Sequence, residues 1–213
     1  MNFDRAKRMV FETLKADAAI FLDDDMTLGR DYLAALDTLT GWAPDDLRMG
    51  FVTAYGKHKL TLEQQQANRL KMCMMSQNWA FATTRQQWLA QRPFVLQFLD
   101  LVSGGDYPGR PHGKIADLFQ SWGLGFPGTS QDIATSHAAI QTGASKVSTV
   151  ACFDRYIGAK GVHLTPEQCA AQGYETSWVV DEPPDLKPPS IDELATCLRT
   201  ARRSAMVHVE IPR

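Results

Sequence analysis

Three consecutive aspartates, Asp23, Asp24 and Asp25, have the clearest chemical potential in this sequence, and they directly follow the apolar run at residues 18–22. Adjacent carboxylates repel one another, and this repulsion is costly unless a cation neutralises it. Such oxygen ligands suit a hard divalent ion, Mg2+ or Mn2+, which commonly shares a few carboxylates with substrate phosphates. The triplet therefore predicts a metal site. The alternative is a solvated acidic turn that leads into the next helix.

The elements that must position these aspartates alternate between helices and strands, which indicates an α/β fold. The apolar run at residues 18–22 is typical of a buried central strand, and ligands dock at the carboxyl ends of such strands. We expect further strands at residues 50–55, 77–83, 146–153 and 205–211. We expect helices at residues 2–16, 30–40, 61–74, 115–119, 130–142 and 190–203, one from residue 84 that Pro93 interrupts, and one from residue 165.

The division of the chain into parts follows its proline content. Residues 1–180 are expected to form the core, and residues 181–190, with four prolines, an extended connector. A helix and a strand in residues 191–213 would complete the chain. In the helix at residues 2–16, the apolar stripe would consist of Phe3, Ala6, Val10 and Leu14.

Composition excludes several classes of protein. Of the 213 residues, 44% are hydrophobic and 22% are charged, as in soluble globular proteins. The net charge of −2 gives no general attraction to nucleic acid. The longest apolar runs are about half a membrane span, and the N-terminal residues do not resemble a secretory signal. We therefore expect a cytoplasmic protein with no transmembrane segment and no nucleic-acid partner.

The four cysteines are widely spaced, and without a signal peptide they are expected to be reduced and mostly buried. No two of the five histidines have the close spacing of zinc ligands, so a zinc site is not expected.

The segment around the aspartates resembles the D-x-D region of GT-A glycosyltransferases, particularly the family-2-like group. Residues 18–36 supply, in the family's order, an apolar strand, the acidic triplet and a helix. The resemblance extends over about residues 2–166 and implies a GT-A-like, partly Rossmann-like mixed sheet flanked by helices. It also implies a hexosyltransferase-type enzyme that uses Mn2+ or Mg2+. Such an enzyme would transfer a sugar from a nucleotide-sugar donor to a hydroxyl of a saccharide or other acceptor, with inversion at the anomeric carbon.

The same resemblance assigns roles to individual residues. Asp23 and Asp25 would hold the metal, Asp23 and Asp24 the diphosphate, and His163, in a late loop, would be a third metal ligand. Asn78 corresponds to an acceptor-side residue in the strand after the metal site. Asp132 corresponds to the family's catalytic base.

The loop at residues 122–128 adds two candidate substrate-binding residues, Trp122 and Gly123. An aromatic face suits a sugar ring or a nucleobase, and glycines allow a loop to close over a ligand. An ordinary tight loop with a packed tryptophan explains the same residues equally well.

Two features depart from the family pattern. Gln131 stands where the family has an acidic residue, and a single expected helix precedes the D-x-D strand instead of a nucleotide-binding half-sheet. The chain is therefore expected to be a fragment or to have its nucleotide site completed elsewhere. The strand at residues 18–22 would then expose an apolar edge, which self-association or the helix at residues 2–16 would cover, and transferase turnover would be low.

A different enzyme class fits the same aspartates. Residues 23–28 also resemble the first motif of haloacid dehalogenase-like phosphatases, in which Asp23 would be the nucleophile and Asp25 the general acid/base, with Mg2+ bound between them and the phosphate. The further residues that such a site needs would be Thr53, Lys114, and Asp117 or Asp132. A non-catalytic GT-A-like binding domain is the third possibility.

Overall fold

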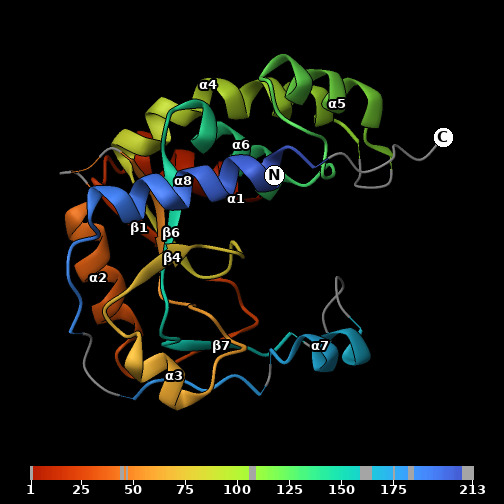
Figure 1. Cartoon of the computed structure of the whole chain (residues 1–213). Coiled ribbons are helices and arrows are strands. Elements are labelled where there is room, and N and C mark those ends of the chain that lie inside the picture. Colours follow the sequence, from red (N-terminus) through yellow and green to blue (C-terminus); the bar gives the residue numbers. More distant parts are fainter. Residues whose placement is uncertain are drawn as a thin grey trace.

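The computed structural model describes residues 2–43, 46, 48–105, 109–158, 165–174, 176–181 and 185–207. It is an α/β structure around a mixed sheet of five strands, with helices on both faces (Figure 1). The sheet strands are β1 (Ala18–Phe21), β3 (Met49–Thr53), β4 (Met72–Met74), β5 (Phe81–Thr84) and β6 (Ser145–Thr149). The helices are α1 (Asn2–Arg8), which continues as the π-helix η1 (Met9–Thr13), α2 (Tyr32–Trp42), α3 (Leu62–Ala67), α4 (Arg85–Val102), α5 (His112–Ser121), α6 (Gln131–Gln141), α7 (Pro166–Gln172) and α8 (Ile191–Ala205).

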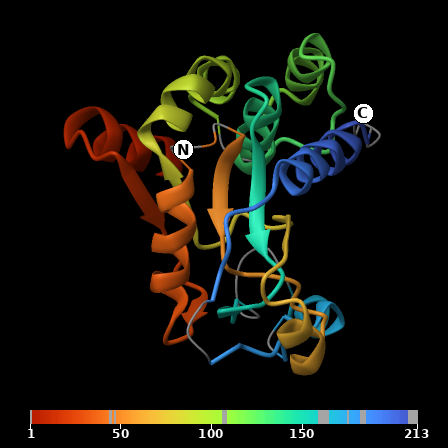
Figure 2. The ribbon, with the colours of Figure 1, turned by 60° about the vertical axis from the view of Figure 1, so that its left-hand side comes forward.

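The strand order is β1-β5-β3-β6-β4, and the strand directions place the carboxyl ends of β1, β3 and β6 at the same edge of the sheet. β1 and β3 are each antiparallel to β5. β3 is parallel to β6, as Figure 2 shows. β1, β3 and β6 therefore run in the same direction, and the loops after them meet. A two-stranded sheet of β2 (Met26–Leu28) and β7 (Asp154–Tyr156) lies beyond this carboxyl edge (Figure 1).

Each face of the sheet has its own core. On one face, Val52, Ala82 and Val147 pack against Leu36 of α2 and Leu194 of α8. On the other, an aromatic layer of Phe21, Phe51 and Phe81 packs against η1, α4 and α6. Because side chains alternate along a strand, Lys146, the neighbour of Val147, lies on this second face.

Several sequence predictions are confirmed. The helices expected to start near residues 61, 84, 130 and 165 do so. Thr61 and Thr165 form capping boxes at α3 and α7, and Ser130 and Thr84 cap α6 and α4. The four cysteines are free, Cys73 half-buried and the others buried. No helix in the described part of the chain combines the length and apolar character that crossing a membrane requires.

Other predictions are wrong. The helix expected at residues 61–74 ends at Ala67, because Met72–Met74 instead pairs with β6 as strand β4. Pro93 lies inside α4 without ending it. The small β2–β7 sheet was not expected, and of the strand predicted at residues 205–211, Ala205 is helical and residues 208–213 lie outside the described part.

The first helix buries the expected stripe only in part: Ala6 and Val10 pack against the aromatic core as predicted. Leu14 is 68% exposed, whereas Asp4, Lys7 and Phe11 are buried. These three positions share the 3–4-residue spacing of one helical face. α1 and η1 therefore bring charged side chains, and not only apolar ones, onto the aromatic face of the sheet.

β1 is an edge strand in the described sheet, not the expected central one. It pairs with β5 on one side, and Ile20 and Leu22 remain 39% and 48% exposed. Phe11 of η1 contacts Phe21 on one face of β1 and leaves these two side chains uncovered. An apolar edge strand offers unpaired backbone groups to another strand.

We predict that the chain self-associates through the free edge of β1. Ile20→Lys should lower the associated fraction in sedimentation velocity, because a charge on an edge strand opposes pairing with another strand. Met206→Lys, which places the same charge on another exposed apolar residue, is the control and should leave association unchanged. Equal association of all three proteins would contradict the prediction.

Candidate functional site

The aspartate triplet forms the turn between β1 and β2 at the carboxyl edge of the sheet. Asp23 and Asp25 are half-buried, and Asp24 is more exposed. The backbone oxygen of Asp25 accepts a hydrogen bond from the Ile157 amide at 2.8 Å, which ties the turn to the end of β7. The Oδ1 atom of Asp25 is buried and has no hydrogen-bond partner among the described residues.

Asp132 lies close enough to Asp23 to affect its ionisation. Burial raises the pKa of Asp23 to about 6, and the charges of Asp25, Asp132 and Asp24 add to the effect. Asp132 is in the first turn of α6, where Ser130 caps the helix and the helix dipole favours an anion. The fold thus brings together the residues that the sequence assigned to metal binding and to general base catalysis.

Two lysines that the sequence analysis did not select flank Asp132. Burial lowers the pKa values of Lys7 and Lys146 to about 8, and the negative charge of Asp132 partly opposes the shift at both. The ammonium of Lys7 also lies 5.1–5.7 Å from the ring centres of Phe51, Phe81 and Trp88, a cation–π arrangement.

Asn78 is held in the site by Lys146, whose Nζ donates a hydrogen bond to Asn78 Oδ1 at 2.8 Å. The chain bends between Asn78 and β5, where Ala80 has a φ of +43°, uncommon for a residue with a side chain. The Ala80 carbonyl accepts hydrogen bonds from the hydroxyls of Tyr32 and Thr53, the latter at 2.8 Å. Core hydroxyls therefore hold the bend that presents Asn78.

An aromatic cluster adjoins the aspartates on the side of β7. Trp79 stacks on Tyr156 with ring centres 3.9 Å apart and meets Tyr174 edge-on at 5.0 Å. Burial, followed by the charge of Asp25, raises the pKa of Tyr156 to about 12. A Cβ at Gly158 would lie 2.7 Å from Asp25 Oδ2 and 2.2 Å from the Tyr156 hydroxyl, so a glycine is needed for this close approach.

Trp122 and Gly123, the two predicted substrate-binding residues of the loop at residues 122–128, lie where helices α4 and α5 meet. The indole of Trp122 donates to Gln97 at 3.4 Å and packs edge-on against Phe94 at 5.5 Å. Gly123, with a φ of +71°, follows the C-cap of α5 in a left-handed conformation. These described contacts give Trp122 and Gly123 a packing and capping role at the junction of α4 and α5.

The residues present suit a divalent cation, although the described part of the chain gives an incomplete ligand set. The buried, unpartnered Asp25 Oδ1 and the repulsion that acts on Asp23 are both features that a cation would relieve. Among the described residues, no three His, Cys, Asp or Glu side chains are grouped so as to hold a metal. His163, the expected third ligand, lies outside the described residues.

No protein-family model matches the chain, and no curated protein matches its sequence.

We predict that Asp23→Asn stabilises the protein when a chelator is present. A carboxyl whose pKa is raised by folding destabilises the folded state once it ionises, so the destabilisation is fully present above about pH 6 and fades toward pH 4. The melting temperature of the variant should exceed that of the wild type by about 2–4 °C at pH 7.5, the shift that roughly 1 kcal/mol gives in a domain of this size.

Differential scanning calorimetry at pH 7.5 and pH 4 measures this difference. The control is Asp37→Asn, the same change at an exposed aspartate on α2, outside the acidic turn. A variant that is less stable than the wild type at pH 7.5 would show that Asp23 does not experience net repulsion.

Proposed function

We propose that this protein is a metal-dependent, glycosyltransferase-like enzyme of GT-A type that transfers a sugar from a nucleotide-sugar donor to an acceptor hydroxyl with inversion. The observation that carries the proposal is the convergence of Asp23 and Asp132, two carboxylates from distant parts of the sequence, at the carboxyl edge of the sheet. A glycosyl transfer of this kind needs a cation at the departing diphosphate and a base at the attacking hydroxyl, and these two aspartates supply one group for each.

Asp23 and Asp25 would hold Mn2+ or Mg2+, which when bound supplies Lewis-acid stabilisation of the departing diphosphate. The uncompensated charge at Asp23 and the unpartnered Oδ1 of Asp25 support this assignment. Asp24, which is exposed in the same turn, would orient the donor.

Asp132 would accept the proton of the acceptor hydroxyl as that oxygen attacks the anomeric carbon. Asp132 is exposed, which lets a substrate reach its carboxylate, whereas Lys7 is buried and Lys146 half-buried. The two ammonium groups would fix the carboxylate by attraction while Lys146 orients Asn78 on the acceptor side.

The phosphatase alternative finds less support. The Thr53 hydroxyl is buried and donates to the Ala80 carbonyl, so it is not available to a phosphate. Lys114 and Asp117 are exposed on α5, a helix that packs against α4. Among the charged candidates, the charge of Asp132 acts on Asp23.

The proposed donor side of the site adjoins β1. In the family that the sequence resembles, nucleotide-binding strands lie on this side of the D-x-D strand, and the described sheet has β1 as its outermost strand. We propose that strands paired to β1 complete the donor site, so that transferase turnover depends on them.

Metal binding gives the first test of the proposal. Mn2+ should bind weakly to the protein alone and more tightly with a nucleoside diphosphate, because phosphate oxygens complete the coordination shell. Asp25→Ala should abolish the heat of Mn2+ binding in titration calorimetry, and Asp37→Ala should not. Unchanged binding to Asp25→Ala would remove the metal assignment.

A second prediction separates the two enzyme classes. The protein should not hydrolyse an aryl phosphate in the presence of Mg2+, and beryllofluoride should not raise its melting temperature. A nucleoside diphosphate with Mn2+ should raise that temperature, because a ligand of the folded state stabilises it. Aryl phosphatase activity that Asp23→Asn abolishes would instead establish the phosphatase class.

A further inference from the structure

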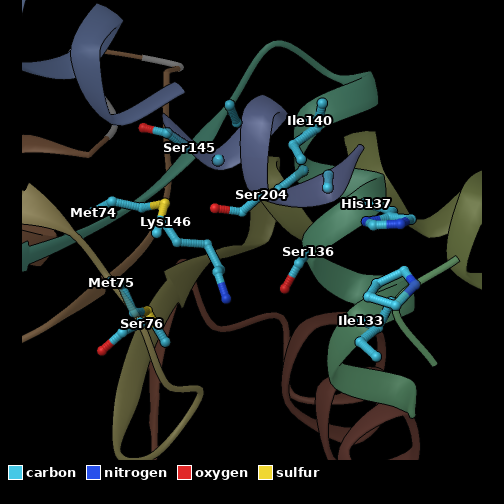
Figure 3. A pocket seen from close by; sticks show the side chains of 15 residues that line it. Met74, Met75, Ser76, Ile133, Ser136, His137, Ile140, Ser145, Lys146 and Ser204 are labelled. Carbon is cyan, nitrogen blue, oxygen red and sulfur yellow. The ribbon is translucent and has the colours of Figure 1, made fainter. Parts of the chain in front are cut away.

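A cavity of about 170 Å³ lies between α6, α8 and the β4–β6 edge of the sheet. Its wall is mostly apolar, with Met74, Met75, Ile133 and Ile140 together with small residues of α8. The polar residues on the wall are Ser76, Ser136, His137, Ser145, Lys146 and Ser204. Figure 3 shows the Lys146 side chain extending from β6 into this cavity toward Ser136 of α6, with Ser204 of α8 above them. The cavity is thus an apolar space with an ammonium group on one side.

This cavity adjoins the proposed catalytic groups. Ser136, on its wall, donates a hydrogen bond at 2.7 Å to the backbone oxygen of Asp132, one helical turn earlier on α6. Lys146, also on the wall, binds Asn78 and interacts with the charge of Asp132. Asp132 is not among the residues that line the cavity, but Ser136 and Lys146 place its wall about one helical turn from the base that the proposed function requires.

The size and the wall of the cavity restrict what it can hold. A cavity of about 150 Å³ accommodates one benzene ring, so this space suits a single ring or a short alkyl chain. A pyranose would bring several hydroxyls against apolar side chains, and burying a polar group without a hydrogen bond is unfavourable. The wall therefore favours an apolar group over a sugar.

The ammonium group adds a charge requirement. Lys146 Nζ donates to Asn78 Oδ1, and an ammonium has three donors. In the described structure, the Lys146 ammonium interacts with the neutral Asn78 amide and with the more distant charge of Asp132. At pH 7, below its pKa of about 8, the side chain is mostly protonated and can pair with a ligand carboxylate.

We infer that this cavity is the acceptor site and that it selects a small apolar acceptor, a hydroxylated aryl or short-chain alkyl carboxylate whose carboxylate pairs with Lys146. The role of this cavity as an acceptor site rests on the proposed function. Binding of a carboxylate in the cavity does not. The apolar body would lie between α6 and α8, and the acceptor hydroxyl would face Asp132.

Binding of simple probes to the full chain tests the inference without metal or nucleotide. Hexanoate and benzoate should bind in NMR titrations at pH 7 with millimolar Kd values, the range expected of such small ligands. Hexanol, which lacks the charge, and gluconate, which lacks the apolar body, should each bind at least about tenfold more weakly, because one of the two requirements is then unmet.

Two variants and a control locate the binding. Lys146→Met should weaken hexanoate binding by about tenfold or more, because the charged partner is lost. Ser204→Trp, a change at an exposed residue on the cavity rim, should block binding by filling the entrance. Arg202→Trp introduces the same indole at an exposed residue of α8 outside the cavity wall and should leave the Kd unchanged.

The outcomes separate this inference from the proposed function. Hexanoate binding that Ser204→Trp leaves intact, or equal binding of hexanoate and gluconate, would overturn the inference even where Mn2+ and a nucleoside diphosphate bind as proposed. Hexanoate binding that depends on Lys146, in a protein that binds no Mn2+ with a nucleoside diphosphate, would support the carboxylate pocket and overturn its role as an acceptor site.

Discussion

The burial of charge beside the carboxyl edge of the sheet is the constraint on which the rest of the structure depends. Lys7 is buried among aromatic rings, Lys146 extends from the same face of the sheet, and Asp23 and Asp25 follow directly on β1. Removing such groups from water is costly unless each finds an opposite charge, a hydrogen bond or an aromatic face. The positions of α1, η1 and α6 are those that provide these partners, since they bring Lys7 and Asp132 to the same place.

This constraint explains why the two faces of the sheet differ in character. The face covered by α2 and α8 is an ordinary aliphatic core, with Leu36, Val52 and Val147 at its centre. The other face carries aromatic side chains and both lysines, and aromatic rings stabilise a buried cation through their negative faces. Both faces thus bury apolar side chains, and the two lysines lie on the aromatic one.

The sequence allowed much of the local structure to be predicted, because caps and apolar runs act over a few residues. Thr61, Ser130 and Thr165 each identify a helix start, and residues 18–21 form the expected strand before the aspartates. Strand β4 was missed because its conformation comes from pairing with β6, a contact far away in the sequence. The edge position of β1 also depends on the order of strands, which local patterns do not specify.

The site residues, too, could be predicted where the signal is local in the sequence and not where it depends on the fold. The triplet is visible as a run of like charges, and Asp132 was selected only through the family resemblance. Lys7 and Lys146 were missed because a lysine in an amphipathic helix or a strand is normally assigned to the solvent side. The spacing of Asp4, Lys7 and Phe11 marks one helical face, and it could have shown that charged residues share the buried side with Phe11.

The backbone conformation of Ala80 has a consequence for the thermodynamics of ligand binding. Its positive φ is maintained by two core hydroxyls, so the shape of the segment that carries Asn78 and Trp79 is set when the protein folds. A ligand that contacts this segment meets a surface already in its bound form and loses little free energy to ordering it. The cost of ordering this segment is thus met during folding and does not subtract from the affinity.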